Sequence, residues 1–407
     1  MKKLLFLLSA AAVIVVLFCS CSSMEKPPIE GSYYVHAEGN DRNNGLSEEY
    51  PFRSLFKAMV MAVDSRIKTI TVIGTLNAES EQSINTERVF FIQGMGTTPI
   101  LIRGKISDTN PAVLSAAGTG RRVVLIRGTV PIRFENIEIS GGFSSNEIGG
   151  LGIGPGSTVT LGPVTVIRDN QSNFLGGGVF VAPGGSLFVD GAKIFDNRSD
   201  APGGGIAVAG QTSVLVIRNG EIYNNHAQAG GGIALYQGSS FTLSGGVIHS
   251  NTADLAGGGV ILNQDCIFTM EGGEIRGNRS SGSGGGIALM ERSSFILLNG
   301  EILENRAAEH GGGIASDHTG IITIQGGFIS SNRAASSGGG VFTSGAFFKS
   351  AGRIYGRDMP QDAANAANSG AAIFVYHMDG TRTREISAGD NLVLDASVDD
   401  GWIITNE

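Results

Sequence analysis

The chain of 407 residues has few charged side chains and no excess of basic ones. Charged residues make up 16% of the sequence, and 37 acidic against 29 basic residues give a net charge of −8. Nucleic acid is therefore not an expected partner, because phosphate binding needs a basic surface. Three cysteines are too few for a disulfide framework. The histidines share no metal-ligand spacing, so we expect neither a metal nor a cofactor.

Long uninterrupted apolar segments are also lacking beyond the N-terminus. Glycine occurs 62 times, yet it follows no Gly-X-Y period, which excludes collagen. Hydrophobic residues reach 41%, too many for a disordered chain. Because glycine interrupts each apolar run before it reaches helix length, the composition predicts many short strands joined by tight turns.

The N-terminus carries an export signal. Met1-Lys2-Lys3 precedes an apolar run from Leu4 to Phe18, which is short for a bilayer crossing and typical of a secretory signal. The segment resembles a bacterial lipoprotein signal of the spirochaete type. That resemblance implies that residues 1–20 are removed and that Cys21 carries the lipid, since Ser20 before it is small, with Cys19 as the alternative. Residues 21–32 then form a tether to the membrane, and we expect the protein in the bacterial cell envelope, at the outer membrane or cell surface.

A strict 27-residue repeat fills the middle of the chain. A Gly-Gly-Gly triplet, followed by Val or Ile, begins at Gly176, Gly203, Gly230, Gly257, Gly284, Gly311 and Gly338. An Ile-x-x-Asn motif precedes each triplet and ends at Asn170, Asn197, Asn225, Asn251, Asn278, Asn305 and Asn332. Such periodicity is the signature of a repeat architecture.

Each repeat contains three short apolar segments bounded by Gly, Ser or Asn, which we interpret as strands. In one repeat they are residues 233–235, 241–243 and 247–248. Three strands per 27 residues predict an all-β, right-handed parallel β-helix that climbs about 4.8 Å per coil, with about eleven coils.

Residues one coil apart should then stack as ladders. Phe241, Phe268 and Phe295 form an apolar ladder in the core. Asn251, Asn278, Asn305 and Asn332 form a second ladder of side-chain amides. Cys266 aligns with Ser239 and Ser293, so we interpret it as a small structural residue rather than a nucleophile.

The repeat resembles the pectin-lyase-like right-handed β-helices, and more closely the chlamydial polymorphic outer-membrane-protein repeats. Gly-Gly-Gly-Ile and Ile-x-x-Asn stand here where those repeats carry Gly-Gly-Ala-Ile and Phe-x-x-Asn. The resemblance covers residues 149–376 and implies surface display and adhesion.

The two ends should close the stack. Residues 33–69 form an N-terminal module with a helix that covers the first coil, and its apolar face is expected to comprise Phe52, Leu55, Phe56, Met59, Val60 and Val63. Asp41 and Asn43 are interpreted as turn formers rather than calcium ligands. The β-helix spans residues 70–376, with regular repeats over 149–350, and residues 377–407 form a C-terminal cap.

No strip of catalytic side chains is evident. Hydrolysis or elimination needs convergent carboxylates or an acid beside a base. The residues expected to face outward after the triplets contain one acid and no base: Ala207, Ala209, Ala234, Tyr236, Ile261, Asn263, Ala288, Met290, Ala315 and Asp317. We therefore predict no catalytic residues.

Two polar clusters remain as candidate sites. Asp317 and His318 lie one coil beyond Glu291, which we interpret as a solvated polar cluster rather than an acid–base site. Asp265 and Arg292 are in phase for an ion pair.

The second cluster is a column of arginines at coil spacing, Arg279, Arg306 and Arg333. Stacked guanidinium groups suit a sulfated or uronic polysaccharide. The alternative is that the nearby Glu301, Glu304 and Glu309 neutralise them.

These observations favour a non-enzymatic, lipid-anchored surface protein, adhesive or structural and monomeric, that contacts a host or matrix protein or an acidic polysaccharide. The alternative is a polysaccharide-binding or polysaccharide-degrading protein of the lyase or glycosidase type, an analogy that rests on the fold.

Overall fold

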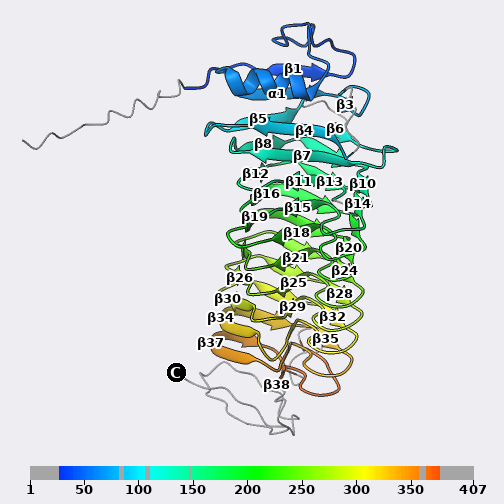
Figure 1. The fold of residues 1–407 in the computed structure, drawn as a ribbon. Helices are drawn as coiled ribbons and strands as arrows, with labels where there is room; N and C mark the ends of the chain where they lie inside the picture. Colours follow the sequence, from blue (N-terminus) through cyan, green and yellow to red (C-terminus); the bar gives the residue numbers. More distant parts are fainter. Residues whose placement is uncertain (1–26, 82–86, 106–110, 146–147, 357–363, 376–407) are drawn as a thin grey trace, which may run out of the picture.

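The chain winds into a stack of parallel coils. The computed structural model describes residues 27–81, 87–105, 111–145, 148–356 and 364–375 (Figure 1). The predicted right-handed parallel β-helix is confirmed. The first coils are longer than the regular 27 residues: Ile70 pairs with Ile102, and Ile102 with Phe134. The signal, Cys19, Cys21 and the predicted cap at 377–407 lie outside the described residues and stay predictions.

The coils form three parallel sheets, and we name them by their place in the coil. The front sheet follows the glycine triplets with one strand per coil: β4 (Arg88–Gly94), β7 (Arg122–Gly128), β11 (Leu151–Ile153), β15 (Val179–Val181), β18 (Ile206–Ala209), β21 (Ile233–Tyr236), β25 (Val260–Asn263), β29 (Ile287–Leu289), β33 (Ile314–Ser316), β36 (Val341–Thr343) and β38 (Ile373–Val375).

The double sheet comes next along the coil and holds both remaining predicted strands: β1 (Tyr33–His36), β2 (Thr69–Ile73), β3 (Thr75–Leu76), β5 (Ile100–Gly104), β6 (Ala112–Ser115), β8 (Ile132–Glu135), β9 (Ile137–Ser140), β12 (Thr158–Leu161), β13 (Val166–Arg168), β16 (Ser186–Phe195), β19 (Val214–Tyr223), β22 (Ser240–Leu243), β23 (Val247–His249), β26 (Ile267–Met270), β27 (Glu274–Arg276), β30 (Ser294–Leu297), β31 (Glu301–Leu303), β34 (Ile321–Ser330) and β37 (Ala346–Ile354).

The short sheet was not predicted. Its two-residue strands follow the ladder asparagines: β10 (Phe143–Ser144), β14 (Gln171–Ser172), β17 (Arg198–Ser199), β20 (His226–Ala227), β24 (Thr252–Ala253), β28 (Arg279–Ser280), β32 (Arg306–Ala307) and β35 (Arg333–Ala334). Two residues carry too little apolar pattern to be recognised as a strand. The regular coil therefore contains four strands rather than three.

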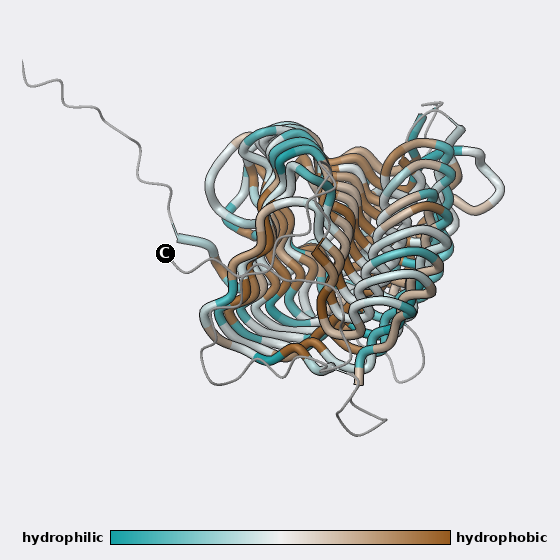
Figure 2. The backbone as a smooth tube through the Cα atoms, turned by 90° about the horizontal axis from the view of Figure 1, so that it is seen from below, coloured by the Kyte–Doolittle hydropathy of each residue, from teal (hydrophilic) through white to brown (hydrophobic). Residues whose placement is uncertain are grey.

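The predicted phenylalanine ladder fills the interior. Phe268 is the strand partner of both Phe241 and Phe295, and all three side chains are buried. The ring centroids of Phe241 and Phe268 lie 4.3 Å apart, and those of Phe268 and Phe295 lie 5.0 Å apart. The view along the stack shows hydrophobic residues of successive coils superimposed (Figure 2). One coil cannot cover this face alone, so its burial depends on the neighbouring coils.

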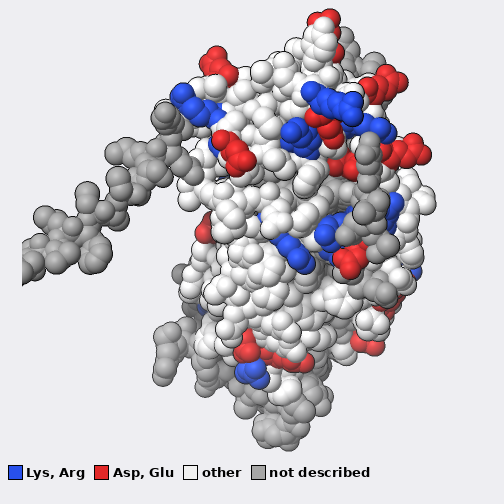
Figure 3. All heavy atoms as spheres, turned by 45° about the horizontal axis from the view of Figure 1, so that its top comes forward, with Lys and Arg blue, Asp and Glu red and all other residues white. Residues whose placement is uncertain are grey.

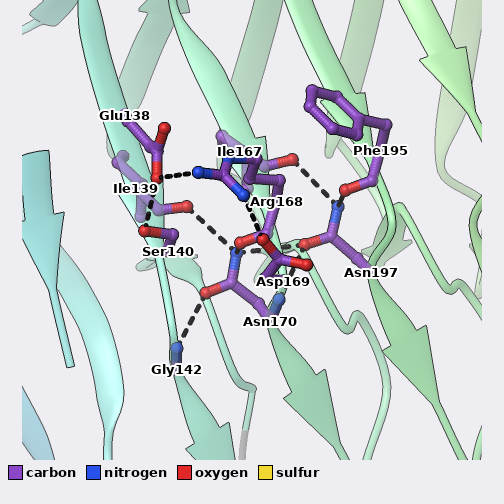
Figure 4. Close-up of polar contacts among 10 residues, drawn as sticks. All are labelled: Glu138, Ile139, Ser140, Gly142, Ile167, Arg168, Asp169, Asn170, Phe195 and Asn197. Carbon is purple, nitrogen blue, oxygen red and sulfur yellow. Dashed lines mark hydrogen bonds and ion pairs between the residues drawn. The ribbon is translucent and has the colours of Figure 1, made fainter. Parts of the chain in front are cut away.

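The predicted asparagine ladder satisfies every polar atom of its side chains. The Nδ2 group of Asn278 donates to Oδ1 of Asn305 at 3.0 Å and to the carbonyl oxygen of Ile248 at 2.9 Å. Its own Oδ1 accepts from the backbone N–H and the Nδ2 group of Asn251, both at 3.0 Å. Figure 4 shows the start of this ladder at Asn170 and Asn197. Satisfied amides of this kind allow polar residues to be fully buried at a turn.

The backbone bends sharply just before each ladder asparagine. The residue there adopts the left-handed conformation without being glycine in most coils, with φ of 54° at Asp169, 53° at Asn224 and 58° at Glu304. Asp and Asn tolerate this region better than other residues with a Cβ atom. The glycine triplets meet a different requirement, close backbone approach: a Cβ on Gly231 would lie 2.3 Å from the carbonyl oxygen of Thr252.

The prediction that the residues after the triplets face solvent is wrong in one respect. This strip faces away from the main core, but Ala207, Ala234, Ile261, Ala288 and Ala315 are buried. Residues that directly precede the glycine triplets cover the strip: Ala229 and Ala256 form a second small core with Ala234, Ile261 and Ala288. Small side chains occupy these positions because the overlying backbone is close, as in the 2.8 Å that would separate a Cβ on Gly284 from that of Ala288.

The predicted cap helix, α1 (Leu55–Asp64), packs on β1, β2 and β4 at the end of the stack (Figure 1). Its buried face is Leu55, Ala58, Met59 and Ala62, whereas Phe56 and Val60 are 57% and 42% exposed. The predicted face was therefore partly wrong, because the helix is apolar nearly all round and the small alanines permit the closer approach.

The turn before α1 has the expected structural role. Oδ1 of Asp41 accepts from the backbone N–H groups of Arg53 and Ser54 at 2.8 and 2.9 Å, and Ser54 caps the helix by accepting from the N–H of Lys57. Asn43 donates to the carbonyl oxygen of Pro51. The last part of the predicted tether already pairs with the body, since Ile29 donates to the carbonyl oxygen of Arg66. In the described ranges, no helix is both long and apolar enough to span a bilayer.

Candidate functional site

The three predicted arginines form a continuous column on the short sheet. Arg279 in β28 is the strand partner of Arg306 in β32, which in turn is the partner of Arg333 in β35. Neighbouring parallel strands lie about 4.8 Å apart, so the three side chains start from positions one strand spacing apart. All three residues are exposed. The asparagine ladder beside them fixes this register, because each arginine directly follows a buried ladder asparagine.

The column carries unbalanced positive charge. Within the described part of the chain, no carboxylate lies within 4.0 Å of any of the three guanidinium groups, and none of these groups makes a hydrogen bond. Other arginines of this chain are paired: Arg168 contacts buried Glu138 at 3.0 Å (Figure 4), and Arg276 contacts Glu274 at 3.1 Å. On the N-terminal face, basic and acidic side chains lie side by side (Figure 3).

The predicted alternative, neutralisation by nearby glutamates, is not what the structure shows. Glu301 lies in the double sheet, where its strand partners are Glu274 and Phe328. Glu309 accepts a hydrogen bond from the hydroxyl of Ser283 instead. Glu304 occupies the left-handed bend before Asn305 and makes no ion pair among the described residues. The sequence places these glutamates near the arginines but cannot show which way their side chains turn.

A groove of about 760 Å³ follows the column along the stack. Its walls combine the three arginines with small side chains and hydroxyl groups: Thr252, Ala253, Ser280, Ser281, Ala307, Ala308, Ala334, Ala335, Ala366, Ala367 and Asn368. The residues beside the arginines carry little side-chain volume, which leaves room for a ligand in the groove.

His226 and Asp254 close one end of the groove. The Nε2 atom of His226 lies 3.4 Å from Oδ2 of Asp254, and its Nδ1 atom lies 2.9 Å from the hydroxyl oxygen of Thr252. One coil earlier, Arg198 pairs with Asp200 at 3.4 Å. Sequence reasoning missed the histidine because the repeat slips by one position at Asn225, although its place directly after that asparagine was a usable signal.

The second predicted cluster does not assemble as an acid–base site. Oδ2 of Asp317 accepts from the backbone N–H of Glu291 at 2.9 Å, and its Oδ1 accepts from Thr319 and Gly320. Burial alone would raise the pKa of Asp317, but these hydrogen bonds hold it below the ordinary value. His318 is exposed, and no contact brings it to Glu291. Asp317 therefore fixes a turn.

The predicted ion pair of Asp265 and Arg292 is confirmed, with two contacts of 2.8 Å. The hydrogen bond from Arg292 holds the pKa of Asp265 below its ordinary value. Both residues are fully exposed, so the pair contributes little to stability. In the described ranges, no group of three or more His, Cys, Asp or Glu is placed to hold a metal ion.

The structural role expected for Cys266 agrees with its contacts. Its side chain is buried, with Sγ 3.4 Å from the hydroxyl of Ser239, and its backbone N–H donates to the hydroxyl of Ser293.

An aromatic stack on the double sheet was not predicted. The rings of Phe195 and Tyr223 lie 4.7 Å apart with an interplanar angle of 8°, and those of Tyr223 and His249 lie 5.0 Å apart at 4°. Because the rings cover one another, their shared faces are closed to a ligand. Burial, aided by Arg276, lowers the pKa of His249. This stack is therefore part of the scaffold.

Comparison with known proteins agrees with the fold. Residues 120–267 and 177–350 match the family described as the right handed β-helix region. The two matches together cover more than half of the chain, so the protein belongs to this family.

Among solved structures, the GH136 lacto-N-biosidase from Eubacterium ramulus is similar, with 12% identity and a TM-score of 0.38 over 92% of this chain and 68% of that chain. A similarity of this size carries no information on activity. Comparison with the curated proteins gives no match.

Proposed function

We propose that this protein is a non-catalytic binding rod of the bacterial cell envelope, tethered through a lipid on Cys21, that holds an anionic matrix or host surface component. The observation that carries the proposal is the column of Arg279, Arg306 and Arg333, which is exposed along a groove and has no ion-pair partner in the described ranges. Guanidinium groups bind carboxylate and sulfate groups through paired hydrogen bonds. A rigid stack presents such groups at a fixed repeat, which suits extended contacts made of many weak interactions.

The chemistry of the groove favours binding over turnover. Its described lining contains one carboxylate, Asp254, and that carboxylate contacts His226. Hydrolysis of a glycosidic bond uses two carboxyl groups that flank the bond. The alternative function, a polysaccharide-degrading enzyme, draws support from a groove of about 760 Å³ that is large enough for sugars.

One experiment separates these two functions. Purified full-length protein is passed over surfaces coated with polygalacturonate or with a neutral glucan at low salt, and the eluate is assayed for new reducing or unsaturated ends. We expect retention on the acidic polymer alone, without new chain ends. Equal retention on both surfaces, or chain cleavage lost in Asp254→Asn, contradicts the proposal.

The envelope location is tested separately. Cells expressing the protein are fed a labelled fatty acid, and the Cys21→Ser and Cys19→Ser variants are compared. We expect the label to depend on Cys21. Label that survives Cys21→Ser and is lost in Cys19→Ser would place the lipid on the neighbouring cysteine instead.

A further inference from the structure

We propose that the arginine groove binds a linear polysaccharide with regularly spaced anionic groups, laid parallel to the β-helix axis, with one group on each of Arg279, Arg306 and Arg333. This inference rests on the proposed binding function and names the ligand class and its orientation. It follows from the charge, shape and repeat of the groove.

The charge argument comes from a comparison within the same sheet. Two positions after Arg198 the chain carries Asp200, and the two side chains pair at 3.4 Å. The equivalent positions after Arg279, Arg306 and Arg333 carry Ser281, Ala308 and Ala335. Their backbones keep the same register, since the N–H of Asp200 donates to Ser172 and the N–H of Ala308 donates to Ser280.

The internal counter-charge is therefore missing in three consecutive coils. Like charges directly opposite each other on neighbouring strands are destabilising. Although the chain has a net charge of −8, no carboxylate of the described residues lies within 4.0 Å of these three guanidinium groups. An anion bound at each coil supplies the negative charge that the chain does not place beside these arginines.

The shape of the groove sets the orientation of the ligand. The lining runs from His226 and Asp254 at one end, past the three arginines, to Ala366 and Asn368 at the other. The arginines succeed one another coil by coil, so they define a line along the stack axis. A polymer that crosses the coils at right angles meets only one of them.

The repeat favours a sugar chain over a peptide. Arginines on adjacent coils start about 4.8 Å apart, whereas same-face side chains of an extended peptide recur only every second residue, at about 6.6 Å. The hydroxyl of Ser281 and the amide of Asn368 lie in the same lining and match sugar hydroxyl groups.

Nucleic acid fits this groove less well. Single-stranded nucleic acids are held by aromatic side chains on which the bases stack. The described lining has no Phe, Tyr or Trp, and His226 is its only ring.

The test uses full-length protein and galacturonate oligomers of one to six residues, with neutral glucose oligomers of the same lengths and oligothymidylate as comparisons. Binding is measured by calorimetry at low salt, and each mixture is assayed for cleavage. The informative variants are Arg306→Ala, which removes the central cation, and Ala308→Asp, which copies the Arg198–Asp200 arrangement while keeping the arginine. Arg276→Ala is the matched control, because Arg276 pairs with Glu274 outside the groove.

We expect affinity for galacturonate to rise with each residue up to three and then to level off. Arg306→Ala and Ala308→Asp should each weaken trimer binding by about tenfold, and Arg276→Ala should not change it. Circular dichroism of Ala308→Asp confirms that the fold is retained.

The outcomes separate the inference from the proposed function. Galacturonate affinity that does not depend on length, or that is unchanged in both groove variants, overturns the inference and leaves the binding function standing. Cleavage of the oligomers overturns the non-catalytic function, while loss of binding in Ala308→Asp still supports the ligand class. Tighter binding of oligothymidylate than of galacturonate overturns the polysaccharide ligand.

Discussion

Arg306 lies directly against Arg279: the two are strand partners in adjacent coils, and neither guanidinium group meets a carboxylate in the described chain. A protein gains no stability from such an arrangement, because opposed like charges on neighbouring strands repel. We therefore propose that the column serves ligand binding rather than stability. The predictions below separate binding residues from scaffold residues on that basis.

The first prediction contrasts a free arginine with a paired one. Arg306→Ala should leave the free energy of unfolding within about 0.5 kcal/mol of the original. Arg168→Ala should lower it by about 1–3 kcal/mol, because Glu138, only 8% exposed, loses the guanidinium that it contacts at 3.0 Å. Urea denaturation measures both variants. An Arg306→Ala protein that is clearly less stable than Arg168→Ala would assign the column to the scaffold.

The second prediction concerns the asparagine ladder. Asn278→Ala removes the acceptor of two hydrogen bonds from Asn251 and the donor to the carbonyl oxygen of Ile248. Buried polar groups left without partners cost about 1–3 kcal/mol each, so a loss of at least about 3 kcal/mol is expected. Exposed Asn299→Ala is the control, with almost no change expected. Similar unfolding midpoints for the two variants would rule out a stabilising ladder.

The third prediction concerns the apolar ladder. Phe268 is fully buried between Phe241 and Phe295, so Phe268→Ala should cost about 3–5 kcal/mol. Phe268→Leu should cost less, since it leaves a smaller cavity. The control is Phe328→Ala at a residue that is 43% exposed. Thermal unfolding that ranks Phe328→Ala as the more damaging change would contradict the stacked core.

The scaffold could be predicted because the repeat is strict. Residues 27 apart must be neighbours once coils stack, and this placed Phe241, Phe268 and Phe295, the asparagines and the arginine column correctly. The ladder continues to Asn365, which was missed because the last coil is lengthened to 33 residues.

The predictions that failed concern the orientation of surface loops, of the helix and of side chains. The alanine strip at Ala234 and Ala288 was expected to face solvent, since a repeat does not reveal that a loop folds over its neighbour. The face of α1 was misplaced because Phe56 and Val60 are as apolar as Leu55 and Met59. The neutralising role of Glu301, Glu304 and Glu309 failed because proximity in sequence does not fix side-chain direction.

The fourth prediction is a pH dependence at the N-terminal cap. Glu81 is half-buried beside α1, where its carboxylate accepts from the backbone N–H groups of Leu55 and Phe56 at 2.6 and 3.3 Å. Burial raises the pKa of Glu81 from 4.5 to about 7 in spite of these hydrogen bonds, and nearby Asp41 acts in the same direction.

Because the folded pKa lies above the unfolded one, the folded cap binds more protons between these two values. The contribution of Glu81 to stability is therefore fully present below pH 4.5 and falls as the pH rises to about 7. Hydrogen exchange at α1 is expected to be faster at pH 8 than at pH 5 after correction for intrinsic rates. Glu81→Gln should remove most of that difference, and an unchanged pH dependence in this variant would assign it to other groups.

The most direct test of the account is the salt dependence of binding to polygalacturonate. If three arginines each neutralise one anionic group, the logarithm of the affinity should fall linearly with the logarithm of the salt concentration. The slope should correspond to about three neutralised charges. Arg306→Ala should lower that slope by about one contact, and Arg276→Ala should leave it unchanged. A slope that is the same in all three proteins would mean that the arginine groove is not where the polymer binds.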